Sequence, residues 1–465
     1  MFSSTAYTHR RRQLYESDRL RGGLVLLLGN EQSAMNYADN PYPFRQDSTF
    51  LYYVGIDAPG MDVVLDLDAG TGCLYADDHS LDDVVWMGEH PTREDYAEAS
   101  GLPATADRDT LQMDLEEAIA AGRPVHFLPP YRAEHRLRLA RLLGLQPERV
   151  SSYVSTPLKT HVAAQRSQKS PEEVEQLEQA LDATAEMHMH AMQRAHPGVT
   201  ERTIAGEIAG IADAQGRGLS FRPTCSVHGD VLHNHSYENT LQDGDLLLVD
   251  AGASSPHYYA GDITRVAPVG GSFTPRQEDL YTAVLDAQVS AIQAIEPGRP
   301  FLEIHLHACQ VLAERLIDIG LMKGSAEAAV DAGAHALFFP HGLGHMLGLD
   351  THDMENFGED IVGYAPDQQR SDQFGLHTLR LARPLEPGFV VTVEPGCYFI
   401  PALIDQWNAE NRHAEFIDYT AVDDFVGLGG IRIEDDVLVT QDGPRVLGPG
   451  IPKDVDAVEA QVSAA

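Results

Sequence analysis

Lysine is nearly absent from this chain of 465 residues, which has it only at Lys159, Lys169, Lys323 and Lys453. Acidic residues outnumber basic ones 70 to 33, which gives a formal net charge of −37. A surface this acidic repels nucleic acid and anionic membranes, so we expect neither as a partner. One hypothesis is a source in high salt, where screening relieves the self-repulsion, and the alternative is an ordinary acidic bacterial protein.

Long apolar runs and cysteine motifs are also missing. No apolar stretch approaches the roughly 20 residues that cross a bilayer, and no apolar signal core follows the N-terminus, so a cytoplasmic protein is expected. The cysteines are scattered without Cys-x-x-Cys spacing, at Cys73, Cys225, Cys309 and Cys397. We therefore expect buried, reduced thiols rather than a zinc ribbon or a disulfide framework.

Two domains are expected, because 465 residues exceed what one ordinary hydrophobic core accommodates. From Gly23 to about Pro157, short apolar segments alternate with helical ones, as is typical of an α/β domain. Expected strands are Val25–Leu28, Phe50–Val54, Val63–Leu67 and Val125–Leu128, and expected helices are Leu111–Ala121 and Arg132–Leu143. A polar stretch at 158–168 marks the boundary, which predicts domains over residues 1–165 and 166–465.

The second domain opens with helical signals. Ser170 and Glu173 form a capping box with Pro171 at the first helical position of a long helix, and Thr200 can cap the next helix. Expected strands are Leu246–Asp250, Tyr258–Asp262, Val390–Glu394, Gly396–Ile400 and Gly430–Val439, and expected helices are Leu280–Ile295 and Leu302–Ile319. Mixed strands with helices to one side fit an α+β layer.

Two aspartates stand at strand ends in this second domain. Asp250 closes the apolar run at 246–249, and Asp262 follows two small residues on the expected neighbouring strand. A carboxylate at the end of a buried strand is costly unless it is paired or bound to a cation. One such aspartate is explained as a cap or a turn residue, whereas two on neighbouring strands indicate ligands.

Three further segments carry candidate ligands. His341 and His345 lie in a glycine-rich segment, where the missing side chains allow a close approach to a ligand. Glu394 ends an apolar strand. Glu434 follows Arg432 by two residues, which places both side chains on one face of the expected strand.

Four histidines on helices are left out of the ligand set. His188 and His190 lie two residues apart, as do His305 and His307. Residues at this spacing point to different faces of a helix, so all four are expected to be ordinary helix residues.

Asp250, Asp262, His345, Glu394 and Glu434 together offer four carboxylates and one imidazole. Such an oxygen-rich set favours manganese, with cobalt, iron and zinc as alternatives. Four carboxylates would leave surplus negative charge around a single ion, so two divalent ions are expected. Two metals that share a water lower its pKa and stabilise a tetrahedral intermediate, so the predicted chemistry is metal-assisted hydrolysis.

These motifs, in this order, resemble those of the pita-bread metallopeptidases, in the branch of prolidase and aminopeptidase P. The segment Asp39–Leu67, with Phe44-Arg45-Gln46-Asp47-Ser48, is similar to the N-terminal domain of that branch, so the resemblance covers nearly the whole chain. It implies an α/β N-terminal domain followed by an α+β pita-bread catalytic domain. It also implies hydrolysis of Xaa-Pro bonds in di- or oligopeptides, and a homodimer.

The resemblance implies a role for each ligand. Asp262 and Glu434 would bridge the two ions, and Asp250 would complete the shell of one of them. His345 and Glu394 would complete the other shell. Glu394 would also act as the general acid/base for the bridging water.

Four other residues are assigned by the same resemblance. His352 would steady the substrate carbonyl and the tetrahedral intermediate, and His233 would be a second histidine facing the substrate, although neighbouring histidines blur that match. Arg432 would orient Glu434 or another carboxylate through its guanidinium. His341 would lie behind the ligands or in the substrate pocket.

Arg380 bears on the choice of substrate. A dipeptidase must bind the free carboxylate of proline, for which arginine is the natural partner. Arg380 resembles the arginine that contacts this carboxylate in prolidases, so a dipeptidase is favoured and an aminopeptidase P is the alternative. A non-catalytic pita-bread binding module is the alternative of a different class, and the presence of all five ligands speaks against it.

Overall fold

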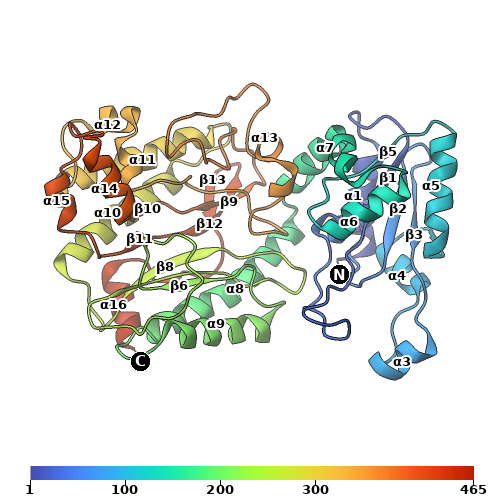
Figure 1. Cartoon of the computed structure of the whole chain (residues 1–465), viewed down its shortest axis with the longest axis horizontal. Helices are drawn as coiled ribbons and strands as arrows, with labels where there is room; N and C mark the ends of the chain where they lie inside the picture. The colour runs from blue at the N-terminus through green and yellow to red at the C-terminus, as the bar shows by residue number, and fades with distance from the viewer. Residues whose placement is uncertain (1, 465) are drawn as a thin grey trace. The chain divides into compact units, whose positions relative to one another are not determined.

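The computed structural model describes residues 2–464, and the chain divides into two compact units between Gln165 and Arg166 (Figure 1). Within the described residues, no helix is long and apolar enough to cross a membrane.

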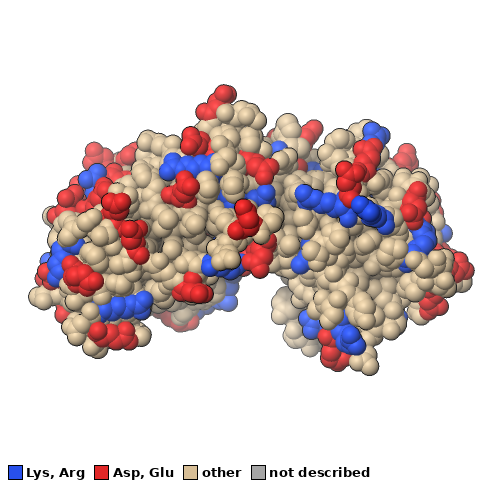
Figure 2. All heavy atoms as spheres, turned by 90° about the horizontal axis from the view of Figure 1, so that it is seen from above, with Lys and Arg blue, Asp and Glu red and all other residues tan. Residues whose placement is uncertain are grey.

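All four cysteines are free thiols, and three are buried as expected, whereas Cys73 is only partly buried. Acidic side chains are spread over the visible face with arginines and lysines among them (Figure 2).

The N-terminal unit is built on a five-stranded mixed sheet in the order β4-β3-β2-β1-β5. β1 runs antiparallel to β2 and parallel to β5. The strands are β1 (Leu24–Leu28), β2 (Asp62–Asp66), β3 (Thr71–Tyr75), β4 (Ala104–Ala106) and β5 (Val125–His126). The helices are α1 (Ser4–Tyr15), α2 (Ser48–Tyr53), α3 (Leu81–Met87), α4 (Arg93–Ser100), α5 (Leu111–Ala120), α6 (Ala133–Leu142) and α7 (Thr156–Ser167). Leucines of β1 form a core with apolar residues of α5 and α6.

One expected strand of this unit is wrong. The segment Phe50–Val54 belongs to helix α2. The carboxylate of Asp47 accepts hydrogen bonds from the backbone N–H groups of Thr49 and Phe50, each at 2.9 Å, and so caps the helix. Because every residue of α2 is buried, its apolar run has no polar face that would distinguish a helix from a strand.

The second unit contains three small antiparallel sheets, in the orders β6-β7-β8, β13-β12-β9 and β10-β11. The strands are β6 (Thr224–Ser226), β7 (Leu246–Ala251), β8 (Ile263–Pro268), β9 (Val390–Val393), β10 (Gly396–Tyr398), β11 (Gly430–Arg432), β12 (Asp435–Thr440) and β13 (Gly443–Val446). The helices are α8 (Pro171–Gln193), α9 (Glu201–Gln215), α10 (Pro275–Gln293), α11 (Phe301–Ile319), α12 (Ala326–Ala332), α13 (Glu359–Val362), α14 (Pro401–Ala409), α15 (Tyr419–Asp423) and α16 (Val455–Ser463).

Helices flank these sheets. Helices α8, α9 and α16 pack against β6–β8, and α10 packs against β9, β10 and β11 (Figure 1). The capping box predicted at Ser170 is present at the start of α8, and Thr200 caps α9 as predicted. The strands therefore lie between two groups of helices.

Two expected strands of this unit differ from the structure. Tyr258–Asp262 is not a strand, because Tyr258 has a positive φ of 68° and β8 begins only at Ile263. The expected strand Gly430–Val439 is two strands, since β11 pairs with β10 whereas β12 pairs with β9. The chain changes sheets at 433–434, so Glu434 occupies the break rather than the face of a continuous strand.

Candidate metal centre

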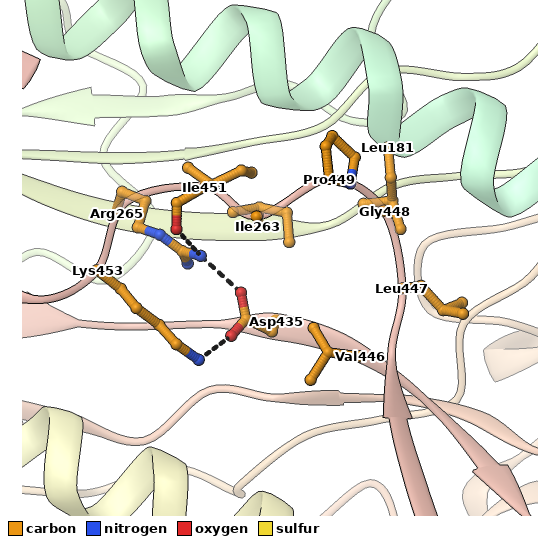
Figure 3. Close-up of a pocket in the computed structure, with 11 residues that line it drawn as sticks. Leu181, Ile263, Arg265, Asp435, Val446, Leu447, Gly448, Pro449, Ile451 and Lys453 are labelled. Carbon is orange, nitrogen blue, oxygen red and sulfur yellow. Dashed lines mark hydrogen bonds and ion pairs between the residues drawn. The ribbon is translucent and has the colours of Figure 1, made fainter. Parts of the chain in front are cut away.

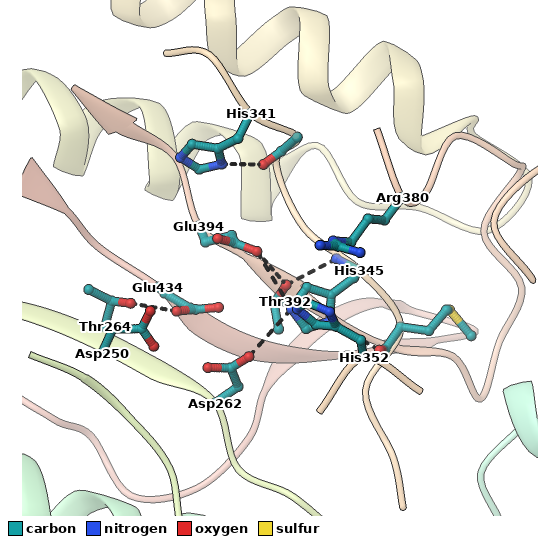
Figure 4. Close-up of polar contacts among 12 residues, drawn as sticks. Asp250, Asp262, Thr264, His341, His345, His352, Arg380, Thr392, Glu394 and Glu434 are labelled. Carbon is teal, nitrogen blue, oxygen red and sulfur yellow. Dashed lines mark hydrogen bonds and ion pairs between the residues drawn. The ribbon is translucent and has the colours of Figure 1, made fainter. Parts of the chain in front are cut away.

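The five predicted ligands lie on neighbouring segments of the second unit. Asp250 lies within β7, Asp262 directly precedes β8, Glu394 directly follows β9, Glu434 joins β11 to β12, and His345 lies on the segment after α12. Their side chains point into one shared space (Figure 4). Ligand atoms of Asp262, His345 and Glu434 all lie within 4.8 Å of one another. Nε2 of His345 is 3.4 Å from Asp262 Oδ2 and 3.6 Å from Glu394 Oε1.

Backbone hydrogen bonds between the segments fix this arrangement. The N–H of Glu434 donates to the carbonyl of Thr264 at 3.1 Å, and the N–H of Glu394 donates to that of Leu343 at 2.8 Å. The N–H of His345 donates to Thr392 Oγ1 at 3.1 Å. A side chain at Gly344 would place its Cβ 2.0 Å from the carbonyl oxygen of Thr392, so this close approach requires glycine.

The carboxylates of the site repel one another. Burial, followed by the charges of Asp262, Glu394 and Asp250, raises the pKa of Glu434 well above its usual value. Burial and Asp250 do the same for the pKa of Asp262. Burial also raises the pKa of Glu394 to about 7, although His345 and Arg432 oppose the shift. These groups remain anionic together only if positive charge is supplied.

Arg432 is a buried hub of this network. Its Nη2 donates to Asp250 Oδ2 at 2.5 Å, its Nε donates to Thr264 Oγ1 at 3.1 Å, and its Nη1 donates to the Tyr398 hydroxyl at 3.0 Å. Thr264 Oγ1 in turn donates to Glu434 Oε2 at 2.6 Å. Arg432 thus orients Asp250 directly and Glu434 through Thr264.

A second set of charges holds the chain on the far side of Glu434. Arg265 donates through Nη1 to the carbonyl of Glu434 and through Nη2 to Asp435 Oδ1, both at 2.6 Å. Nζ of Lys453 donates to the other oxygen of Asp435 at 2.6 Å. Figure 3 shows Asp435 between these two cations, at the edge of a cavity of about 210 Å³. Although burial opposes it, the two cations lower the pKa of Asp435 to about 2.

His352 and Arg380 are joined by a residue that the sequence did not single out. Glu355 Oε2 lies 2.7 Å from His352 Nδ1, and Glu355 Oε1 pairs with Arg380 Nη1. The rings of His352 and His345 meet edge to face with centroids 4.2 Å apart. The hydrogen bond with His352 and the charge of Arg380 lower the pKa of Glu355 to about 2. Arg380, Glu355 and His352 are therefore linked by successive contacts that extend to the imidazole of His345.

The remaining predicted histidines take different positions. Nε2 of His341 lies 2.8 Å from the Tyr398 hydroxyl and its Nδ1 lies 2.8 Å from the carbonyl of Gly342, so this ring contacts Tyr398 rather than the carboxylates. Burial lowers its pKa to about 3. His233 is half-buried, and its pKa is lowered by burial and shifted by the charges of Asp250 and Arg432. No direct contact of His233 with a ligand is found among the described residues.

The donor set suits divalent cations. Four carboxylates and one imidazole converge, while Arg432 contributes a single positive charge to them. Hard or borderline divalent ions prefer oxygen ligands of this kind, and they would relieve the repulsion that raises the carboxyl pKa values.

Two family models match this chain. The model of metallopeptidase family M24 matches residues 175–441, and that of the aminopeptidase P N-terminal domain matches residues 7–126. The chain belongs to metallopeptidase family M24. The resemblance predicted from the motifs is thereby confirmed, and so is a hydrolase that depends on divalent metal ions.

Relatives of this M24 protein match along nearly its whole length. Human Xaa-Pro dipeptidase is 31% identical over 94% of this chain and 88% of the human protein. The probable Xaa-Pro aminopeptidase pepP of Aspergillus fumigatus is also 31% identical, over 94% of this chain and 92% of the fungal one. The structure of aminopeptidase P from E. coli with the inhibitor Pro-Leu has a TM-score of 0.81 at 29% identity, covering 100% and 99% of the two chains. These matches confirm the predicted fold class, an α/β N-terminal domain followed by a pita-bread domain.

Several residues around this M24 site were missed by sequence reasoning. They are Thr264, Arg265, Glu355, Tyr398 and Asp436, the last of which accepts a 3.0 Å hydrogen bond from the N–H of Asp262. Each contacts a segment far away in the chain, although Glu355 also contacts His352, three residues before it. The sequence offered one local indication, because Thr264, Arg265 and Asp436 lie within three residues of a predicted ligand.

Proposed function

We propose that this chain hydrolyses Xaa-Pro bonds and that its preferred substrates are Xaa-Pro dipeptides. The observation that carries the proposal is the convergence of Asp262, His345 and Glu434 within 4.8 Å, with Glu394 and Asp250 beside them. Similarity to human Xaa-Pro dipeptidase and to E. coli aminopeptidase P over nearly the full chain supports the substrate class.

Two divalent ions are proposed for this site, with manganese favoured over cobalt, iron and zinc. A zinc-substituted form of E. coli aminopeptidase P is among the similar structures, in line with a site that accepts more than one divalent ion. Asp262 and Glu434 would hold both ions, Asp250 would complete one shell, and His345 and Glu394 the other. When bound, the ions would supply an activated water and polarise the scissile carbonyl.

The residues around the ligands would move protons and orient the substrate. Glu394, whose burial raises its pKa to about 7, would take a proton from the attacking water and pass it to the proline nitrogen. His352, held by Glu355, would donate a hydrogen bond to the oxyanion of the tetrahedral intermediate. His233 would face the substrate, Arg432 would keep Asp250 in place, and His341 would support the pocket through Tyr398.

Arg380 favours the dipeptidase over the aminopeptidase. Its side chain is about one-third exposed, so its guanidinium can reach a substrate while it remains paired with Glu355. A planar guanidinium binds a carboxylate through two parallel hydrogen bonds, and only a dipeptide places a free carboxylate directly on the proline. An aminopeptidase P that releases the first residue of longer peptides is the second candidate, favoured by the structural likeness to that enzyme.

The test compares Ala-Pro with Ala-Pro-Ala on manganese-loaded enzyme. We expect efficient hydrolysis of Ala-Pro, and an Arg380→Ala variant whose KM for Ala-Pro rises at least about tenfold, because one charge-assisted contact is lost. Arg383→Ala is the matched control, since that guanidinium pairs with Glu386. Preference for the tripeptide would make the protein an aminopeptidase P. Silence on both peptides would favour a binding module.

The wider setting is proposed on the same basis. We expect a cytoplasmic homodimer whose partners are proline-containing peptides, without binding to nucleic acid or to membranes. The net charge of −37 supports the last two points, because it repels polyanions. Domains over residues 1–165 and 166–465 are proposed as the N-terminal and catalytic parts, in line with the division of the structure between Gln165 and Arg166.

A further inference from the structure

A second group of potential metal ligands lies apart from the carboxylates. His305 and Cys309 lie four residues apart on α11, and so share one face of the helix. His335 belongs to a 3-10 turn, Ala334–Leu337, that follows α12. One ligand atom from each residue lies within 4.8 Å of the other two. None of the three has more than 1% of its surface exposed.

Hydrogen bonding leaves much of this group unsatisfied. Sγ of Cys309 lies 3.4 Å from Nε2 of His305. Over the described part of the chain, Nδ1 of His305 and both ring nitrogens of His335 have no hydrogen-bond partner. Buried polar atoms are nearly always paired, so an imidazole with two unpaired nitrogens in a closed interior has both nitrogens available to bind a metal ion.

We propose that His305, Cys309 and His335 bind one thiophilic metal ion, and that this ion is monovalent copper. Two imidazoles and one thiol match the soft and borderline ligands that copper(I) and zinc prefer over oxygen. With ordinary metal–sulfur and metal–nitrogen bond lengths, sulfur and nitrogen on one ion lie roughly 3.5–3.8 Å apart. The observed 3.4 Å between Cys309 and His305 is close to this spacing.

The net charge of the metal with its ligands favours copper(I) over zinc(II). Burial and neighbouring imidazoles lower the pKa of His305 to about 3 and that of His335 to about 4, so both rings are neutral and ready to ligate. Binding forms the Cys309 sulfur–metal bond and breaks its S–H bond, and the proton leaves to solvent. A thiolate and copper(I) neutralise each other, whereas zinc would leave a net positive charge in the closed interior. No carboxylate in the described chain contributes to the pKa shift of His305 or Cys309.

The group also has a structural connection to the peptidase site. The ring of His305 contacts that of Phe339 with centroids 5.4 Å apart, and Phe339 contacts His341 at 4.8 Å. A metal held here would tie α11 to the segment that carries His341 and, four residues later, His345. The two sites share no ligand.

The test is a titration of the manganese-loaded protein with copper(I) under exclusion of oxygen, against a copper(I) chelator, with zinc(II) in parallel. Incubation lasts hours, because the closed site opens only by local fluctuation. We expect one equivalent of copper(I) per chain, with one sulfur and two nitrogen ligands in the X-ray absorption spectrum. Since the predicted peptidase ligands include no sulfur, a sulfur ligand distinguishes this site from the carboxylate site, and the cysteine variants below identify which thiol binds.

Cys309→Ser and Cys225→Ser are the matched variants. Cys225 is an equally buried free thiol, and its Sγ lies 3.7 Å from the carbonyl of Glu201. We expect uptake to be lost in Cys309→Ser and retained in Cys225→Ser. No uptake, or uptake that survives Cys309→Ser, would overturn the site. Uptake of zinc alone at Cys309 would overturn its assignment to copper(I).

Discussion

Asp353 illustrates how a single buried carboxylate supports the residue beside it. Its two oxygens accept hydrogen bonds from Arg166 at 2.6 Å and from Lys169 at 3.2 Å, and all three side chains are at most 3% exposed. Although burial opposes it, these two cations hold the pKa of Asp353 below its usual value. Because Asp353 directly follows His352, this network anchors the backbone that carries the proposed oxyanion-stabilising histidine.

An Asp353→Asn substitution should therefore affect both stability and catalysis. It leaves two buried cations facing a neutral amide, which typically costs 3–5 kcal/mol of unfolding free energy. We expect a lower melting temperature and, for manganese-loaded enzyme, a fall in kcat for Ala-Pro that exceeds any change in KM. The control is Asp350→Asn, because Asp350 also pairs with Arg166 but is 40% exposed. Equal losses in the two variants would show that the buried network does not position His352.

Short sequence motifs identified the proposed ligands of the site but not the residues that contact them. Glu394 and Glu434 could be proposed as ligands because each stands in a short motif at the end of an apolar run. Glu355 was not assigned a role, because its local contact with His352 gains a second partner only through Arg380, 25 residues away. His335 was missed for the same reason, as 26 residues separate it from Cys309. A short sequence motif can identify a side chain with a chemical function. The residues that this side chain contacts are known only once the fold brings distant segments together.

At the scale of elements, the break between β11 and β12 is the feature that places Glu434. The break lets β11 pair with β10 and β12 pair with β9, so the residue between them belongs to neither sheet. Sequence reasoning joined the two strands because the apolar alternation continues through Ile431 and Ile433. Periodicity reports which side chains are buried, whereas a change of sheet depends on distant pairing partners.

Arg265 stabilises this break, and its replacement should weaken metal binding. An Arg265→Lys variant keeps the charge but loses the fork that joins the Glu434 carbonyl to Asp435. Substitutions behind a metal ligand typically cost 10–100-fold in metal affinity, so we expect manganese to bind about tenfold more weakly, as measured by titration calorimetry. Lys453→Gln is the control, because Lys453 contacts Asp435 but no atom of Glu434 in the described chain. An unchanged affinity in Arg265→Lys would contradict this role.

At the scale of the whole molecule, stability should fall on mild acidification. His188 is buried on α8, with Nε2 3.0 Å from the carbonyl of Ala251, and burial lowers its pKa to about 4. The unfolded chain binds a proton near the ordinary value of 6.5. Between these two values the unfolded state holds more protons, so stability rises with pH and is lost as the pH falls from 6.5 towards 4. The shift corresponds to roughly 3 kcal/mol.

His188→Gln isolates this contribution. The amide can donate to the same carbonyl but does not titrate, while the other buried histidines are unchanged. We expect the melting temperature of the wild type to fall by several degrees more than that of the variant between about pH 7 and about pH 4. Parallel curves would mean that His188 is already protonated in the folded protein.

Overall organisation was the most predictable level. The polar stretch near residue 165 and the capping box at Ser170 predicted where one part ends and the next begins, and the capping box is present as predicted. Helices α8 to α11 agree with their sequence patterns, because in a long amphipathic segment the helical spacing of apolar residues repeats over several turns. A short buried segment such as α2 has too few residues to show a helical period, so the sequence pattern predicted a strand where the structure has a helix.

Five side chains are proposed to bind two divalent ions that cleave Xaa-Pro bonds. The most direct measurement adds manganese stepwise to metal-free protein and follows proline release from Ala-Pro. We predict no activity without metal, saturation at two equivalents per chain, and no recovery in Glu434→Gln, which lacks one of the two carboxylates proposed to bridge the ions. Full activity at one equivalent, or activity in metal-free protein, would contradict the two-metal site.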